Sequence, residues 1–478
     1  MINLKHEKML GFFRKICSIP HISYHTDELR DYIENFAITR HLDYYKDDFG
    51  NILVYKDASE GYENHDTVIL QGHIDMVAAS KNPEYDLVNS PVIIDEEAYN
   101  TGIMKACGTT LGADDGIAVA YMLAILDDDS LRHPGIEALF TTNEEVGLTG
   151  ASYFDCSKLK GRRILNLDSE EEGVFLTGSA GGIRVDSFIN LSQEVVFGEE
   201  INIKITGLKG GHSGDKIGTG RASANSLMLR LINALMDETD IAIHSVRGGT
   251  VDNAIANECE CLIIAKDPDE VSQFCLEFEK SIIQEYFGIE DNISILVGLN
   301  GTTEKNCIQR DCSAKIKMLF SSLPQGVIAR NAEDVFLVET SLNLGILDIS
   351  STVIKYVYLV RSSYESAKLK AASDIRNITE GLMGKSRFSG NYPGWSYNPE
   401  SELRSLIGNV YTKQTGKNPV FKTIHAGLEC GIFYNALNNP DIVSYGPDIH
   451  DIHTAGEWFE IESAIRVYEL TTGLLEIL

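Results

Sequence analysis

An apolar run at Val68–Leu70 leads into Gln71-Gly72-His73-Ile74-Asp75 and constrains the possible folds more than any other stretch of the chain. The run is typical of a buried strand, and the polar residues belong to the loop that follows its carboxyl end. Side chains at positions i and i+2 of extended chain point the same way, so His73 and Asp75 share one face. A carboxylate behind an imidazole orients the ring for metal binding. A lone histidine at a strand end is more often structural, so this stretch alone leaves both interpretations open.

Two further apolar runs, Ile136–Thr141 and Ile164–Leu167, also end in residues that can do chemistry. Asn143-Glu144-Glu145 follows the first run, and Asp168-Ser169-Glu170 follows the second. In open α/β sheets, ligands bind beyond the carboxyl ends of the strands. The three strand ends therefore predict one site at the edge of a sheet in an α/β domain.

A pair of acidic residues, Asp114 and Asp115, precedes a segment whose apolar residues recur at helical spacing from Ile117 to Ile125. The pair is therefore expected at or near a helix start, where backbone N–H groups favour anions. Taken alone, an N-cap is the better interpretation of these two carboxylates. A metal-binding role needs support from the other candidate residues.

The length of 478 residues exceeds the size at which one hydrophobic core keeps growing, so two domains are expected. The pattern changes near residue 183, where a smaller α+β domain is predicted to begin, inserted into the first domain. An apolar stripe over Ala224–Leu235 predicts a helix in this domain. Alternating patterns predict its strands at Ile201–Ile205, Cys259–Ile264, Ala314–Phe320 and Ile354–Val360. The predicted domains are thus residues 1–183 with 385–478, and residues 184–384.

The charge and cysteine content exclude several classes of protein. A net charge of −29 argues against nucleic acid and anionic membrane surfaces as partners, because both require basic patches. No apolar run reaches the roughly 18 residues of a membrane span, and the N-terminal residues 1–18 lack the apolar core of a signal peptide. The nine cysteines contain no CxxC pair, which indicates neither a zinc–cysteine site nor a disulfide framework. A reducing cytoplasm is the simplest location.

Five candidate metal ligands are spread along the chain: His73, Asp114, Glu145, Asp168 and His453. Two imidazoles and three carboxylates suit borderline divalent ions, zinc above all, with cobalt or manganese able to substitute. Two such ions would be neutralised by three carboxylates and one hydroxide. A single zinc ion usually takes three protein ligands and would leave two of these groups unused, so the count favours two ions.

The motifs around these residues resemble, in order, the five metal-site motifs of the M20 metallopeptidases. They are Gln71–Asp75, Leu111–Gly116, Thr142–Gly147, Asn166–Ser169 and Ile452–Thr454. Three stretches resemble the branch of the aminoacyl-histidine (Xaa-His) dipeptidases, also called peptidase D or carnosinase-like: Asp168–Gly173, Gly210–Gly214 and Ile424–Gly431. The resemblance covers nearly the whole chain. It implies a mixed-sheet, di-zinc aminopeptidase-like catalytic domain with an inserted α+β lid domain.

The resemblance also implies a role for each candidate. His73 and Asp168 would bind one ion, Glu145 and His453 the other, and Asp114 both, with a cis peptide bond between Asp114 and Asp115. Asp75 would orient His73, and Glu144 would act as the general base that takes a proton from water held between the ions.

The resemblance implies that the inserted domain is a lid that binds substrate. It also implies that a homodimer forms through this domain. Its substrate-binding positions would be His212, Asn253, Arg361, His425 and Gly427. His212 would stabilise the oxyanion, and Arg361 would hold a free C-terminal carboxylate. Without the resemblance, Gly207–Gly214 is equally well a glycine-rich hairpin with an incidental histidine, and a strand-end arginine is usually a surface charge.

The expected function is hydrolysis of unblocked dipeptides, preferentially Xaa-His dipeptides including β-alanyl-histidine. Gly116 follows the paired acids where many M20 enzymes carry lysine, which makes an aminoacylase or deacetylase role less natural. A tripeptidase or a broad-specificity dipeptidase is the alternative within the family. A non-catalytic metal-binding protein is the alternative from another class, although the five ligands and Glu144 are all present.

Overall fold

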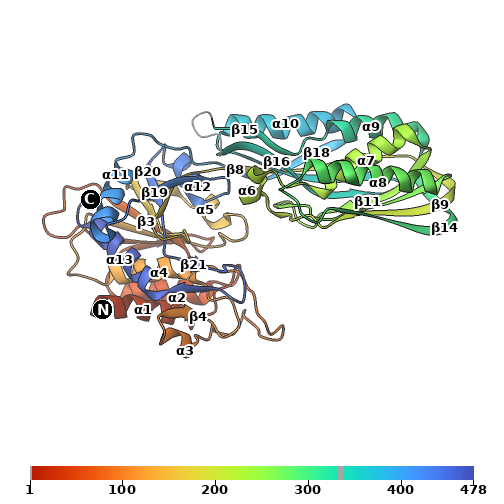
Figure 1. Ribbon diagram of the computed structural model, residues 1–478. Coiled ribbons are helices and arrows are strands. Elements are labelled where there is room, and N and C mark those ends of the chain that lie inside the picture. The colour runs from red at the N-terminus through yellow and green to blue at the C-terminus, as the bar shows by residue number, and fades with distance from the viewer. Residues whose placement is uncertain (1–2, 332–336) are drawn as a thin grey trace. The chain divides into compact units, whose positions relative to one another are not determined.

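The computed structural model describes residues 3–331 and 337–478, which form two compact units. The first unit comprises Met1–Ser179, Trp395–Thr423 and Leu428–Leu478. The second comprises Ala180–Gly394 and Ile424–Gly427, so it is inserted into the first (Figure 1). The chain therefore passes between units at Ser179/Ala180 and Gly394/Trp395, and the sequence prediction placed its domain boundaries at 183/184 and 384/385.

The first unit contains a sheet of eight described strands in the order β1-β2-β5-β3-β6-β20-β7-β19. In that order they are Tyr44–Lys46, Ile52–Lys56, Ile136–Thr141, Val68–His73, Arg163–Asn166, Asp441–Ser444, Val174–Ser179 and Val420–Ile424. The central strands β5, β3, β6 and β20 are parallel, whereas β1, β2 and β7 run antiparallel to their neighbours. This mixed sheet confirms the predicted α/β class. It also brings the carboxyl ends of β3, β5 and β6 to one edge, as in other sheets with parallel central strands.

The first unit has further elements around this sheet. Its helices are α1 (Leu4–Cys17), α2 (Asp27–Thr39), α3 (Glu96–Tyr99), α4 (Ala113–Leu126), α5 (Thr149–Tyr153), α11 (Glu402–Thr415), α12 (Glu429–Ala436) and α13 (Ile461–Leu475), with a 3₁₀ turn, η1, at Cys156–Lys158. A small antiparallel sheet consists of β21 (Ile449–His450), β22 (Trp458–Glu460) and β4 (Ile103–Lys105).

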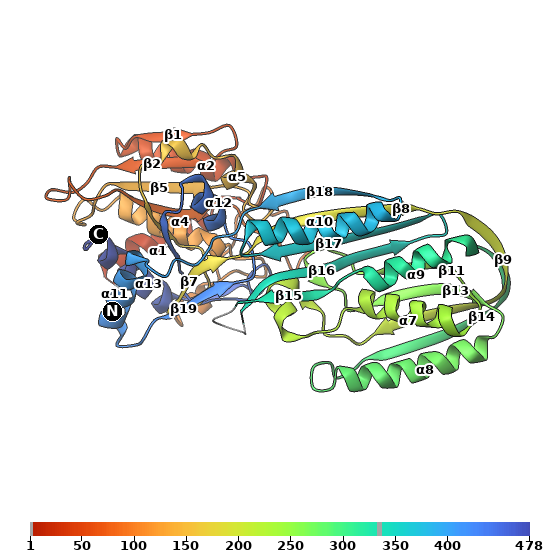
Figure 2. The same cartoon turned by 90° about the horizontal axis from the view of Figure 1, so that it is seen from above.

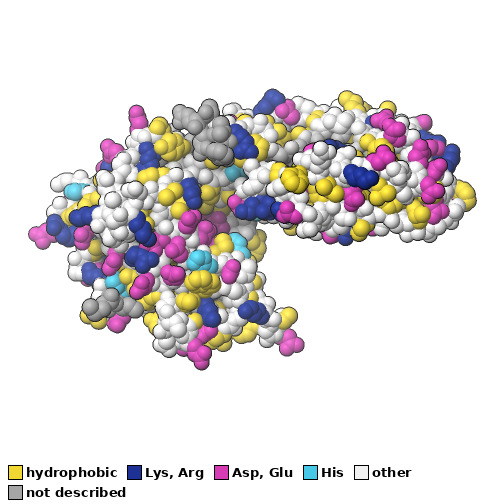
Figure 3. All heavy atoms as spheres, viewed as in Figure 1, with side chains coloured by type: hydrophobic (Ala, Val, Ile, Leu, Met, Phe, Trp, Pro, Cys, Tyr) yellow, Lys and Arg dark blue, Asp and Glu magenta, His cyan; other side chains and the backbone are white. Residues whose placement is uncertain are grey.

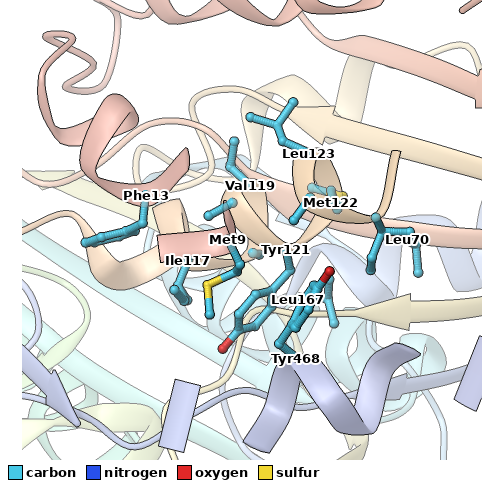
Figure 4. Packing of buried hydrophobic residues seen from close by; sticks show 14 of the residues in the cluster. Met9, Phe13, Leu70, Ile117, Val119, Tyr121, Met122, Leu123, Leu167 and Tyr468 are labelled. Carbon is cyan, nitrogen blue, oxygen red and sulfur yellow. The ribbon is translucent and has the colours of Figure 1, made fainter. Parts of the chain in front are cut away.

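Helix α4 is the central element of the first unit's core. Its side chains are buried on every face, as expected for a helix that is apolar all round. Figure 4 shows Ile117 and Tyr121 of α4 beside Phe13 of α1 and Tyr468 of α13. On the sheet side, α4 lies so close to β3 that a β-carbon on Gly72 would come within 2.7 Å of the Ala118 methyl group. This close packing fixes the start of α4 next to the end of β3.

The second unit contains an antiparallel sheet of nine described strands in the order β14-β9-β13-β11-β16-β17-β8-β18, with β15 also beside β16. In that order they are Ser294–Ile308, Gln193–Thr206, Cys259–Ala265, Ile241–Gly248, Val338–Ile349, Val353–Ser362, Gly181–Asn190, Lys385–Tyr392 and Gly326–Arg330. Strand β18 follows the predicted boundary at 384/385 and belongs to this sheet because it pairs with β8. A separate pair joins β10 (Gly211–His212) to β12 (Ala254–Ile255).

The helices of the second unit cover one face of its sheet, as Figure 2 shows, and share one hydrophobic core with it. They are α7 (Ala224–Glu238), α8 (Pro268–Glu285), α9 (Ser313–Ser322) and α10 (Glu365–Gly381), and the shorter elements are α6 (Ser213–Lys216), η2 (Ile217–Thr219) and η3 (Arg310–Cys312). The strand predicted at Ala314–Phe320 is wrong, because these residues belong to helix α9. Its buried residues Ile316, Leu319 and Phe320 follow helical rather than alternating spacing.

Most acidic residues are surface charge. Asp and Glu together number 70 against 41 Lys and Arg, and on the face seen in Figure 3 the two signs are interspersed over both units. Within the described residues, no helix combines the length and the apolar character that crossing a membrane requires.

Candidate metal centre

Four side chains of the first unit, those of His73, His453, Asp168 and Glu145, lie around the carboxylate of Asp114. One of its oxygens, Oδ1, lies 3.1 Å from Nε2 of His73, and the other, Oδ2, lies 3.1 Å from Nε2 of His453. His73 Nε2 is also 3.6 Å from Oδ1 of Asp168. His453 Nε2 is 2.9 Å from Oε1 of Glu145. Asp114 therefore lies between two groups, each made of one imidazole and one further carboxylate.

The donor set of this cluster fits divalent ions. His73, Asp114 and Glu145 each offer a ligand atom within 4.8 Å of the others, and so do His73, Asp115 and Asp168. Glu145 Oε1 is buried and makes no hydrogen bond to any residue that the structure describes, although an imidazole nitrogen lies close to it. Imidazole and carboxylate ligands in this arrangement are those that zinc and similar ions prefer.

The segment that carries Asp114 is a turn rather than regular helix. Gly112 has a positive φ of 72°, and Asp114 and Asp115 have non-helical backbone angles within the span of α4. The peptide bond between Asp114 and Asp115 is cis, as the resemblance implied. The Asp115 carboxylate points back and accepts the backbone N–H of His73 at 3.1 Å. Asp115 thus ties the start of α4 to the end of β3, a contact that the sequence prediction did not include.

His73 is oriented by the backbone of Asp75. Its Nδ1 lies 2.9 Å from the Asp75 carbonyl oxygen, which accepts the Nδ1–H and leaves Nε2 free to bind a cation. The Asp75 carboxylate is farther away, at 3.7 Å from Nδ1. It instead accepts the backbone N–H of Glu144 at 3.0 Å and the hydroxyl of Ser23 at 2.8 Å. Asp75 therefore contacts both the imidazole and the segment of the expected general base.

Negative charge exceeds what the imidazoles of this cluster can offset. Burial raises the pKa of Glu144 and of Asp168 well above the ordinary carboxyl range, and neighbouring carboxylates add to the effect. Burial lowers the pKa of His73, but the carboxylates of Asp168 and Asp114 outweigh it and raise that pKa well above its ordinary value. Bound cations would stabilise such a cluster by compensating its charge.

A buried carboxylate, Glu429 on α12, connects the strands that lead into the cluster. Its Oε2 accepts hydrogen bonds from Gln71 Nε2 at 2.5 Å and from the Thr141 hydroxyl at 2.6 Å. Asn166 Nδ2 in turn donates to Gln71 Oε1 at 2.6 Å. These partners lie near the ends of β3, β5 and β6, shortly before His73, Glu144 and Asp168. Glu429 lies within the motif Ile424–Gly431, and the sequence alone predicted no role for it.

The predicted substrate-binding residues lie in the second unit. Arg361 on β17 is 5% exposed and donates from Nη1 to the Tyr392 hydroxyl at 2.8 Å. Its Nε is buried and has no hydrogen-bond partner in residues 3–331 and 337–478. His425 Nε2 lies 2.7 Å from the Ser341 hydroxyl, and burial together with the Arg361 charge lowers the pKa of His425 to about 3. Arg361 thus retains an unused buried donor beside a neutral imidazole.

The other three predicted residues belong to loops and short strands of the same unit. His212 is exposed in β10, where it pairs with Ala254 of β12. Asn253 directly precedes β12, and its carbonyl accepts the Ser213 N–H at 2.7 Å. Gly427 leaves room for the ring of Tyr392, because a β-carbon there would lie 2.6 Å from it.

Comparison with known proteins gives matches along nearly the whole chain. Residues 69–476 match the model of peptidase family M20/M25/M40. The cytosol non-specific dipeptidase of Escherichia coli strain K12 is 35% identical over 479 residues, covering 99% of this chain and 98% of that protein.

Solved structures give a similar result. The aminoacylhistidine dipeptidase from Vibrio alginolyticus aligns with a TM-score of 0.89 and 33% identity, covering 98% of this chain and 96% of that one. A tripeptidase from Staphylococcus aureus aligns with a TM-score of 0.57 at 16% identity, covering 100% of this chain and 99% of that one, and this likeness extends to the fold alone. Both the sequence and the structural matches therefore include both units.

Proposed function

Since this chain belongs to peptidase family M20/M25/M40, we propose that it is a metal-dependent dipeptidase that cleaves unblocked dipeptides, preferentially Xaa-His dipeptides including β-alanyl-histidine. The dipeptidases of E. coli and V. alginolyticus, each similar over nearly its whole length, support this substrate class. The observation that carries the proposal is the Asp114 carboxylate, which faces one imidazole with each oxygen. This arrangement suits two ions that share one carboxylate.

His73 and Asp168 would hold one divalent ion, His453 and Glu145 the other, and Asp114 both, with zinc as the first candidate and cobalt or manganese as substitutes. Bound ions of this kind supply Lewis acidity and lower the pKa of water. Glu144 would take the proton from the attacking water and return it to the leaving amine. Asp75 would support metal binding, because its carbonyl orients the His73 ring. It would also support proton transfer, because its carboxylate accepts the backbone N–H of Glu144.

Arg361 would bind the free C-terminal carboxylate of the substrate, because its buried Nε lacks a partner among the described residues and a guanidinium matches a carboxylate. His425, Gly427 and Asn253 would line the same subsite, and His212 would stabilise the oxyanion. The second unit would then act as the lid that selects short, unblocked peptides. Homodimer formation through this unit stays a prediction from the resemblance.

The proposed activity is tested with a panel of peptides. Purified protein loaded with zinc, cobalt or manganese is incubated with Xaa-His dipeptides, β-alanyl-histidine, other dipeptides, the matching tripeptides and N-acetylated dipeptides. We expect cleavage of unblocked dipeptides, fastest with C-terminal histidine, loss of activity on chelation and recovery on adding metal. Equal rates on all dipeptides would favour the broad-specificity alternative, and faster cleavage of tripeptides the tripeptidase. Metal binding without hydrolysis of any peptide would indicate the non-catalytic alternative.

Replacing Arg361 with methionine is expected to lower kcat/KM for unblocked dipeptides about 100-fold, because a buried guanidinium–carboxylate pair is lost. The same change should barely affect the corresponding dipeptide amides, which lack the carboxylate. The measurement compares kcat/KM for each acid and its amide. Arg230→Met is the control, since Arg230 on α7 is paired with Glu285 at the surface. An equal loss for acids and amides would contradict carboxylate recognition by Arg361.

A further inference from the structure

The carboxylate of Glu457 is held by four backbone N–H groups in succession. Its Oε2 accepts from Leu111 at 2.8 Å and Gly112 at 3.0 Å, and its Oε1 accepts from Ala113 at 2.8 Å and Asp114 at 3.2 Å. The side chain is only 1% exposed. Charge-assisted hydrogen bonds are stronger than neutral ones, and four of them fix the turn against this carboxylate. The last of the four donors belongs to the residue whose side chain lies between the two imidazoles.

Glu457 also ends the loop that carries His453. Its own N–H donates to the Thr454 carbonyl at 3.3 Å, and the Thr454 hydroxyl donates to the Asp451 carbonyl at 2.7 Å. Directly after Glu457, Trp458 pairs with Lys105 as β22 joins β4. The loop therefore closes on itself and is anchored to the rest of the unit at Glu457.

One carboxylate thus connects two segments that are far apart in the sequence. His453 and Asp114 are 339 positions apart, yet His453 Nε2 and Asp114 Oδ2 lie 3.1 Å from each other, and in the proposed centre both would bind one ion. Metal–ligand distances tolerate deviations of only about 0.2 Å, so a small shift of the loop would separate these ligands. An ordinary helix cap would stabilise α4 alone. Glu457 instead joins the turn before the regular helix to the loop of another ligand.

We infer that Glu457 is a positioning residue that fixes the His453 loop against the Asp114 turn and so retains the ion shared by His453, Glu145 and Asp114. This inference rests on the two-ion centre of the proposed function. It assigns Glu457 no contact with substrate or metal. Its effect is exerted through the positions of two ligands.

The test measures zinc release rather than activity. Wild-type protein and Glu457→Gln are loaded with zinc, and release to a chromogenic chelator is followed together with the total zinc content and the Tm of the apoprotein. Glutamine keeps the size of the side chain but turns an NH₂ group toward two N–H donors. We expect the ion held by His453 and Glu145 to leave at least about 10-fold faster from the variant, as for other residues that orient metal ligands. The second ion should be affected less, because it keeps His73 and Asp168 and shares only Asp114 with the displaced segments.

Glu137→Gln is the matched control. Glu137 on β5 is also 1% exposed and accepts the backbone N–H groups of Lys160 and Gly161, but it adjoins no candidate ligand in the sequence. This control should lose stability without faster zinc release. If Glu457→Gln shows the same behaviour as Glu137→Gln, Glu457 is merely structural and the inference is overturned.

Glu457→Asp serves if the glutamine variant does not fold. It keeps the charge but shortens the side chain, so the loop must shift to preserve the hydrogen bonds, and selective zinc release is again expected. Unchanged release from this variant would overturn the inference. A wild-type protein that binds no zinc would contradict the proposed two-ion centre instead, and two bound ions without peptide hydrolysis would contradict only the proposed activity.

Discussion

Replacing Glu144 with glutamine is expected to lower kcat for dipeptide hydrolysis about 1,000-fold while both divalent ions stay bound. Glutamine has nearly the same shape as glutamate but cannot take a proton from water at neutral pH. The ions should remain because the proposed ligands do not include Glu144. Metal analysis of the purified variant and steady-state kinetics on one dipeptide check the two parts separately.

Glu171→Gln is the control for this variant, since Glu171 is an exposed carboxylate paired with Lys422 at the surface of the same unit. It should keep the wild-type kcat. If Glu144→Gln also retained most of the activity, another group would have to accept the proton. If it lost its metal ions, Glu144 would be a ligand rather than the base.

Replacing Asp114 with asparagine is expected to abolish activity and to weaken binding of both ions by more than 100-fold, beyond the effect typical of a residue that merely orients a ligand. The carboxylate faces both imidazoles, so a neutral amide removes charge from both ion positions at once. Zinc content after dialysis and isothermal titration with zinc measure the loss. Adding zinc should raise the Tm of the wild-type apoprotein but not the Tm of the Asp114→Asn apoprotein.

Asp127→Asn is the matched control, because Asp127 lies at the other end of the same helix and pairs with Lys8 and Arg40 near the surface. We expect this control to lower the free energy of unfolding by about 1 kcal/mol or less and to leave zinc binding unchanged. If Asp114→Asn kept one ion at wild-type affinity, the shared role of this carboxylate would be wrong.

The sequence predicted the fold well where its patterns are local. The apolar runs predicted as strands at Val68–Leu70, Ile136–Thr141 and Ile164–Leu167 indeed belong to the neighbouring parallel strands β3, β5 and β6, because buried strands have a compositional signature of their own. The segment at Ala314–Phe320 shows the limit of this approach. Over this short stretch the apolar residues fit both the alternation of a strand and the spacing of a helix. Packing against α7 favours the helix.

For the candidate site, the sequence predicted which side chains lie together better than it predicted their contacts. Resemblance to M20 motifs named side chains that the structure brings together, because a ligand set recurs as an ordered series of short motifs. The carboxylates of Glu429 and Glu457 were not assigned, since their partners are Gln71, Thr141 and a backbone turn far away in the sequence. Every residue except proline has a backbone N–H, so the residue types do not reveal which of these groups will donate to a carboxylate. For the same reason, the sequence predicted that the side chain of Asp75 orients His73, whereas its backbone carbonyl accepts the hydrogen bond from the ring.

The strand order of the first unit has a consequence for biosynthesis. Strand β20 lies between β6 and β7, although it is translated some 260 residues after them, with the whole second unit in between. While the chain is still on the ribosome, β6 therefore exposes an unpaired edge until residues 441–444 have emerged from the exit tunnel. His453 emerges later still, so a nascent chain lacks one of the five candidate ligands until this residue has left the exit tunnel.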